Sequence, residues 1–249
     1  MKPLLSYLGC AVLGLVALAP STFAQSDAQF TKANQEYASG HFKEAIDDYE
    51  TLVHSGDWSA NLFYDLGNAY FRTGDFGRAI LNYERALALE PHHPEAQANL
   101  QIARDEARAL ELQRSWLERR LPFATSNQFT TAAALAFWVG AFCLAGLIFG
   151  RRHSSGLITL SILSLASFAL SVAFVFWIDA GSKGRALAIV TGNSIEARVA
   201  TADNANSVLA LPPGSQIKIV SQRGDWLYAE LPNSLHGWIP SRSVEAVQL

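Results

Sequence analysis

Residues 60–93, ANLFYDLGNAYFRTGDFGRAILNYERALALEPHH, decide how the N-terminal half of the chain folds. The same residue types recur 34 positions earlier at six places: Asn34/Asn68, Gly40/Gly74, Phe42/Phe76, Ala45/Ala79, Ile46/Ile80 and Tyr49/Tyr83. A fixed period of this length indicates a helical repeat in which each unit is one helix–turn–helix. Gly74 suits the end of the first helix, where a left-handed residue is needed, and Pro91 suits the end of the second.

The period identifies tetratricopeptide (TPR) repeats over 26–59 and 60–93 within a region spanning 26–120. Two such repeats bury too little apolar surface to be stable, because about three are needed. The missing layer is predicted to be a capping helix over 94–120, since apolar residues recur there at helical spacing. These residues are Leu100, Ala103, Ala107, Leu110, Leu117 and Leu121.

The first helices of TPR hairpins line a concave groove, and this groove is the predicted partner-binding site. The side chains expected to bind a partner are Asn34, Tyr37, Tyr64, Asn68, Phe71 and Arg72, with Phe30, Asn61 and Ile102 on the same side. Amides can bond the backbone of an extended peptide, and the aromatic rings add apolar contact. Two alternatives stay open: the aromatic rings pack between hairpins, and the amides brace the helices.

The N-terminus reads as an export signal. Lys2 precedes an uncharged apolar run over 4–19, and Ala24 ends a small-residue site for signal peptidase. We therefore expect a signal peptide over 1–24, with an uncleaved anchor helix as the alternative. Either reading places the repeats outside the cytoplasm.

Two membrane helices are predicted over 129–149 and 157–178, because 122–150 and 153–178 contain no Asp, Glu, Lys or Arg. Small residues on one face of each helix, including Gly140 and Ser164, are expected to meet. An export signal followed by an even number of spans puts both soluble parts outside. It leaves Arg151 and Arg152 inside, as the positive-inside rule requires.

Short apolar strands alternate with turn residues from Ala186 to the C-terminus, which predicts a small all-β domain over 186–249. This region resembles bacterial SH3-like (SH3b) domains through 211–220, 224–229 and 237–239. The resemblance implies a small barrel, and in that family such domains often bind cell-wall peptides or proteins. Trp226, Tyr228 and Trp238 are the candidate cleft residues, with packing inside the barrel as the alternative for both tryptophans.

Composition argues against several other functions. The formal net charge of −3 offers no basic excess for nucleic acid. Cys10 lies in the signal and Cys143 in an apolar run, so neither can form a Cys/His catalytic pair. No metal-ligand spacing, P-loop or G-x-S-x-G occurs. We therefore expect no enzyme activity, no cofactor and no metal.

The predicted fold class is a multidomain membrane protein with an all-α TPR solenoid, a transmembrane helical hairpin and a small all-β SH3-like barrel. This order, together with the segment Pro94–Leu100, resembles the BatE-type proteins of aerotolerance operons. The resemblance implies other membrane proteins as partners and a role in oxidative stress or envelope integrity. The predicted function is a non-enzymatic inner-membrane scaffold with periplasmic TPR and SH3b modules. The alternative is a peptidoglycan-binding anchor that recruits a cell-wall enzyme.

Overall fold

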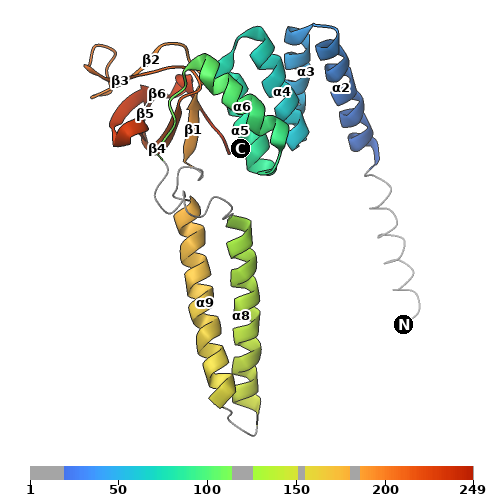
Figure 1. Ribbon diagram of the computed structural model, residues 1–249, viewed down its shortest axis with the longest axis vertical. Helices are drawn as coiled ribbons and strands as arrows, with labels where there is room; N and C mark the ends of the chain where they lie inside the picture. Colours follow the sequence, from blue (N-terminus) through green and yellow to red (C-terminus); the bar gives the residue numbers. More distant parts are fainter. Residues whose placement is uncertain (1–19, 114–125, 151–154, 180–185, 249) are drawn as a thin grey trace, which may run out of the picture.

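The computed structural model describes residues 20–113, 126–150, 155–179 and 186–248 (Figure 1). The first segment holds α2 (Pro20–Ala38), α3 (Phe42–Ser55), α4 (Ala60–Thr73), α5 (Phe76–Leu89) and α6 (Pro94–Ala107). The long helices α8 (Ser126–Phe149) and α9 (Ser155–Asp179) follow. The apolar run of the expected signal peptide, over 4–19, lies outside the described residues.

Helices α2 to α5 form the two hairpins that the period predicts. Gly40 and Gly74 have φ values of 84° and 82°, the left-handed conformation that ends each first helix. Ser59 and Asp75 cap α4 and α5 by accepting the backbone N–H of Leu62 and Arg78. Small residues let the helices cross closely: a Cβ on Gly67 would lie 2.7 Å from Cε1 of Tyr83.

The expected capping helix over 94–120 is wrong in its length. Helix α6 ends at Ala107, and Arg108 turns the chain with a left-handed φ of 52°. The backbone then follows the sheet, where Leu110 accepts from the amide of Gln216 at 2.8 Å. Leu110 packs in the core of the sheet and Leu112 in the helical core, an alternation that suits an extended chain. Residues 114–120 lie outside the described part.

The C-terminal region is one antiparallel sheet. Its strands are β1 (Leu187–Val190), β2 (Ile195–Arg198), β3 (Ser207–Leu211), β4 (Gln216–Arg223), β5 (Trp226–Glu230), β6 (His236–Pro240) and β7 (Val244–Ala246). The order β3-β2-β6-β5-β4-β1-β7 leaves β3 and β7 as edges. The antiparallel all-β prediction is confirmed, but in the described residues no hydrogen-bonded ladder joins the two edges, so the expected closed barrel is not seen.

The helical repeats and the sheet share one hydrophobic core. Leu187, Ile189 and Val247 of the sheet region belong to the same buried cluster as Ile80 and Tyr83. At Gly214, whose φ is 82°, an added Cβ would lie 2.1 Å from Cδ1 of Ile80. The sheet lies beside α5 and α6 (Figure 1). A sheet therefore completes the helical core, whereas the sequence analysis treats the two parts as separate modules.

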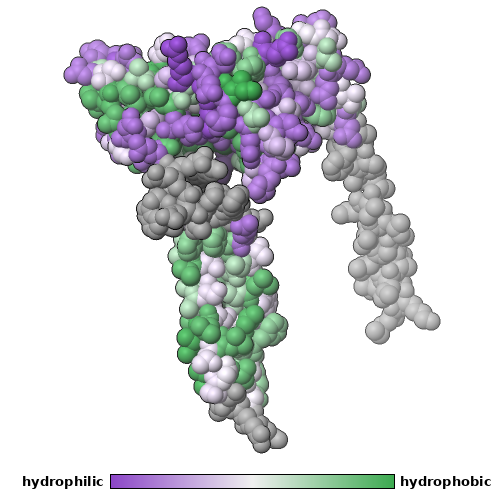
Figure 2. All heavy atoms as spheres, viewed as in Figure 1, coloured by the Kyte–Doolittle hydropathy of each residue, from purple (hydrophilic) through white to green (hydrophobic). Residues whose placement is uncertain are grey.

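Helices α8 and α9 lie side by side and project away from the head, which comprises the repeats and the sheet (Figure 1). Gln128–Phe149 and Ser155–Trp177 are each long and apolar enough to cross a membrane. Hydrophobic side chains cover this hairpin, while the head is largely hydrophilic (Figure 2). The expected contact between small residues is confirmed at Ser164, which donates to the carbonyl of Ala136 and lies against Gly140.

Candidate functional site

The candidate site is a groove of about 140 Å³ that involves α2, α4, α5 and α6. Its lining residues are Tyr37, Asn68, Phe71, Arg72, Tyr83, Asn99 and Ile102. The structure thus brings together four of the predicted partner-binding residues and Ile102. Tyr83 and Asn99, which belong to α5 and α6, were not predicted from the sequence. We call this surface the TPR groove.

Aromatic contacts repeat along the TPR groove with the period of the sequence. Tyr37 meets Phe42 edge-on at 5.3 Å between ring centroids, and Phe71 meets Phe76 in the same way at 5.4 Å. The guanidinium of Arg72 lies 4.6 Å from the centroid of the Phe42 ring, within the range of a cation–π contact. The rings of Tyr37 and Phe71 are therefore fixed by their own hairpins and still line the groove.

The two repeated asparagines bond within their hairpins. Oδ1 of Asn34 accepts from the hydroxyl of Tyr49 at 2.6 Å, and Oδ1 of Asn68 accepts from Tyr83 at 2.8 Å. Both tyrosines are buried. Asn68 also accepts from Nδ2 of Asn99 at 2.8 Å, which ties α6 to the second hairpin. These bonds favour the bracing alternative for the amides over direct contact with a partner.

The Asn–Tyr bond recurs at the same position in successive hairpins, as expected for two copies of one structural repeat. Residues 60–93 match the tetratricopeptide repeat family. The TPR match covers the second hairpin, the clearer of the two in the sequence. No curated protein matches the chain. Among solved structures, the chain is similar to the Yersinia enterocolitica type III secretion chaperone SycD in complex with a peptide of the translocator YopD. The identity is 15%, the TM-score 0.32, and the match covers 63% of this chain and 97% of that one.

Two further predicted groove residues lie apart from the lining of the TPR groove. Asn34 belongs to the first hairpin and is bonded to Tyr49 as described. The ring of Tyr64 lies 5.0 Å from that of His93, and its hydroxyl is 3.4 Å from Nδ2 of Asn99. The structure therefore places Tyr64 against the α5–α6 turn.

The aromatic residues predicted for the sheet share one face of it. Trp226 and Tyr228 alternate along β5 with buried Leu227 and Ala229, so both rings point away from the core of the sheet. Tyr228 lies 5.0 Å from Trp238 between ring centroids. It also stacks on His236 at 5.8 Å, a residue that the sequence analysis missed. We call Trp226, Tyr228, His236 and Trp238 the aromatic face.

The carboxyl group of Asp65 in α4 is partly buried, and its pKa is shifted. Burial raises the pKa of its carboxyl to about 6, and the nearby His93 opposes this rise. In the described ranges, no group of three or more His, Cys, Asp or Glu side chains is arranged to hold a metal ion.

Asp65→Asn is expected to raise the melting temperature at about pH 7.5 but not at about pH 4. Because the pKa is higher in the folded protein, the proton on Asp65 stabilises the fold fully below the unfolded pKa of about 4. That stability is lost as the pH rises through about 6. The asparagine side chain stays neutral at every pH, so the variant does not lose this stability. Thermal melts at both pH values test the prediction, with Asp105→Asn on the exposed side of α6 as control. An equal gain at both pH values would contradict it.

Proposed function

We propose that the protein is a non-enzymatic, membrane-anchored scaffold whose TPR groove binds an extended peptide segment of a partner protein. The carrying observation is the groove itself, where Tyr37, Phe71 and Ile102 leave apolar surface beside the amides of Asn68 and Asn99. Apolar surface of this kind suits the side chains of an extended peptide, while the hydrogen bond between the two amides braces the wall of the groove. Ile102 is 51% exposed and lines the groove, so its side chain is accessible to a bound segment.

The proposal places α8 and α9 across the cytoplasmic membrane and both soluble parts in the periplasm. The two apolar helices and the charge-free spans support the anchor. The apolar run after Lys2 supports export. The BatE-like domain order suggests other membrane proteins of an aerotolerance operon as partners, in a complex that serves oxidative-stress tolerance or envelope integrity.

A second candidate function is suggested by the aromatic face of the sheet. Clustered Tyr and Trp side chains on a surface mark interaction sites, because they bury much area at low entropic cost. If the sheet acts as an SH3b domain, this face would bind peptidoglycan, and the TPR groove would recruit a cell-wall enzyme. Sedimentation of the purified protein with insoluble peptidoglycan separates this function from the scaffold function.

The experiment for the TPR groove is site-specific photo-crosslinking in living cells. A photoreactive amino acid at Ile102 is expected to yield a discrete crosslinked protein, because this position lines the groove. The matched control is Leu89, which is 52% exposed against 51% for Ile102 and ends α5 away from the groove. Replacing Phe71 with alanine should reduce the Ile102 crosslink several-fold while the fold persists by circular dichroism. Equal crosslinks from Ile102 and Leu89 would refute a groove-specific partner.

A further inference from the structure

A second and larger cavity lies where the helical repeats meet the sheet. It measures about 470 Å³ and is bounded by α3, α4 and α5 on one side and β7 on the other. We call it the junction cleft and define it by Glu50, Trp58, Arg78, Asn82, Arg85 and Glu245. It shares no lining residue with the TPR groove. Its function is thus a separate question.

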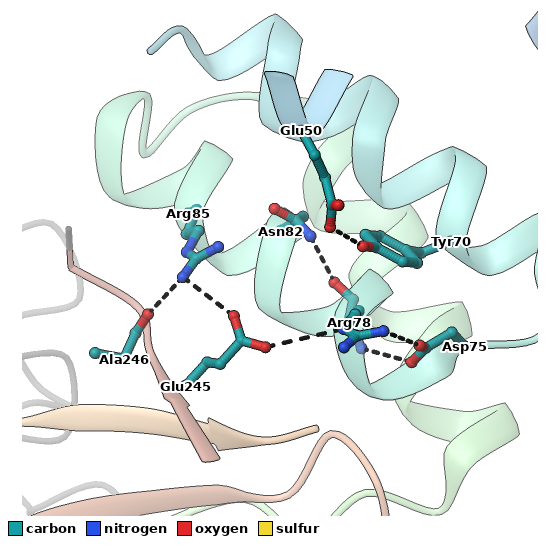
Figure 3. A network of polar contacts seen from close by, with 8 residues as sticks. All are labelled: Glu50, Tyr70, Asp75, Arg78, Asn82, Arg85, Glu245 and Ala246. Atoms are coloured by element: carbon teal, nitrogen blue, oxygen red, sulfur yellow. Dashed lines mark hydrogen bonds and ion pairs between the residues drawn. The ribbon is translucent and has the colours of Figure 1, made fainter. Parts of the chain in front are cut away.

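Two arginines of α5 face one carboxylate across the junction cleft. Arg78 and Arg85 are two turns apart on the helix, and Glu245 of β7 lies between them (Figure 3). Nε of Arg78 is 3.9 Å from Oε1 of Glu245, and Nη2 of Arg85 is 3.7 Å from Oε2. Charge-assisted hydrogen bonds between these groups are about 2.7–2.9 Å long. Glu245 therefore offsets positive charge without accepting a hydrogen bond from either guanidinium.

Arg85 is the less satisfied of the two cations. Only 12% of its side chain is exposed, and its Nη2 donates to the carbonyl of Ala246 at 3.0 Å. Its Nε is enclosed and has no hydrogen-bond partner in the described part of the chain. Burial lowers the pKa of this guanidinium, and the nearby Glu245 carboxylate only partly opposes that shift.

The wall beside Arg85 carries a second unsatisfied group. Asn82 is 2% exposed and donates through Nδ2 to the carbonyl of Arg78 at 2.9 Å. Its Oδ1 has no hydrogen-bond partner among the described residues. At the rim, Trp58 is 47% exposed, and its indole is held by a bond from Nε1 to the carbonyl of Val53. The cleft thus combines two guanidinium groups and a fixed aromatic surface with the carboxylates of Glu50 and Glu245. Arg78 also pairs with Asp75 at 3.3 Å, and Asn82 offers the cleft an acceptor, not a donor.

We propose that the junction cleft binds an oxyanion, either a carboxylate or a phosphate, between Arg78 and Arg85. In the structure, the carboxylate of Glu245 occupies this position. The forked donors of arginine match both kinds of oxyanion, so a ligand at bonding distance makes contacts that Glu245 does not make. Trp58 provides an apolar surface for the rest of the ligand. Because Glu245 belongs to β7, the ligand competes with a contact that joins the sheet to the repeats.

The test is calorimetric titration of the full-length protein in detergent micelles at constant ionic strength. Inorganic phosphate and N-acetylglycine serve as separate probes, and the one that binds more tightly identifies phosphate or carboxylate as the preferred oxyanion. Glu245→Gln is expected to tighten its binding by about tenfold, since a competing negative charge is removed. Arg78→Gln is expected to weaken it by a similar factor. The control, Arg223→Gln on the exposed hairpin of β4, should leave affinity unchanged.

Three results would overturn the proposal. They are no saturable binding of either probe, an affinity unaffected by Glu245→Gln, and an equal loss in Arg78→Gln and Arg223→Gln. Arg78 is 49% exposed, so its replacement keeps the fold, which circular dichroism checks. Arg85→Gln is a second variant, and circular dichroism checks its fold too, because Arg85 also bonds Ala246. None of these variants touches the TPR groove, so the crosslinking result at Ile102 stands independently.

Discussion

Replacing Gly67 with leucine is expected to unfold the helical repeats, with a loss of about 3 kcal/mol or more in the free energy of unfolding. Any Cβ at this position would lie 2.7 Å from Cε1 of Tyr83 and 3.3 Å from the carbonyl oxygen of Ala79. Tyr83 cannot withdraw, because it is 1% exposed and bonded to Asn68. The larger side chain therefore separates α4 from α5 and breaks that bond as well. Thermal and urea unfolding, followed by circular dichroism, measure the loss.

The matched control for Gly67→Leu is Ala98→Leu, which adds the same side chain on the exposed side of α6. We expect this change to alter stability by less than about 0.5 kcal/mol, as surface substitutions usually do. Similar melting curves for the two variants would contradict the close crossing of α4 and α5.

Replacing Arg104 with alanine is expected to cost about 3–5 kcal/mol, the range for breaking one side of a buried ion pair. Arg104 is 6% exposed and pairs with Glu84, whose side chain is 12% exposed. Glu84 also accepts from Nε2 of Gln216 at 2.8 Å, so this network joins α6, α5 and β4. Without Arg104, the Glu84 carboxylate is left buried at the contact between repeats and sheet. Urea unfolding of the full-length protein measures the loss.

A second substitution separates the charge effect from the loss of packing. Arg104→Ala with Glu84→Gln should recover much of the stability, because the uncompensated buried charge is then gone. Arg108→Ala, an exposed arginine at the end of α6, is the single-site control and should be nearly neutral. A loss below about 1 kcal/mol for Arg104→Ala would show that the pair behaves as a surface ion pair.

The helical hairpins could be predicted because their determinants are local and repeated. Gly40 and Gly74 recur at one period, as do Ala45 and Ala79, and each does in the structure what its residue type predicts. The same period also contains the spacing of a hydrogen bond between repeated residues. Asn34 and Tyr49 are 15 residues apart, as are Asn68 and Tyr83, which is the spacing of the bracing hydrogen bond.

The end of α6 and the joint between the repeats and the sheet could not be predicted from local pattern. Leu110 continues the helical spacing of apolar residues, but a backbone bond to Gln216, 106 positions later, holds it in extended conformation. The bond between Glu84 and Gln216 spans 132 positions. A single sequence gives no sign of such pairs. The junction cleft depends on these long-range contacts and could not be predicted from the sequence. Most of the TPR groove could be predicted, because its residues follow the repeat period.

The shared core of repeats and sheet has a consequence for biosynthesis. The ribosome completes α2 to α6 before it makes α8 and α9, and Leu187, Ile189 and Val247 emerge last. The repeats therefore keep an uncovered apolar face until these residues have been made and pack against it. If the hairpin spans the bilayer, a chain that inserts only one of the two helices leaves its sheet on the other side of the bilayer from its repeats. In such a chain the apolar face of the repeats stays uncovered.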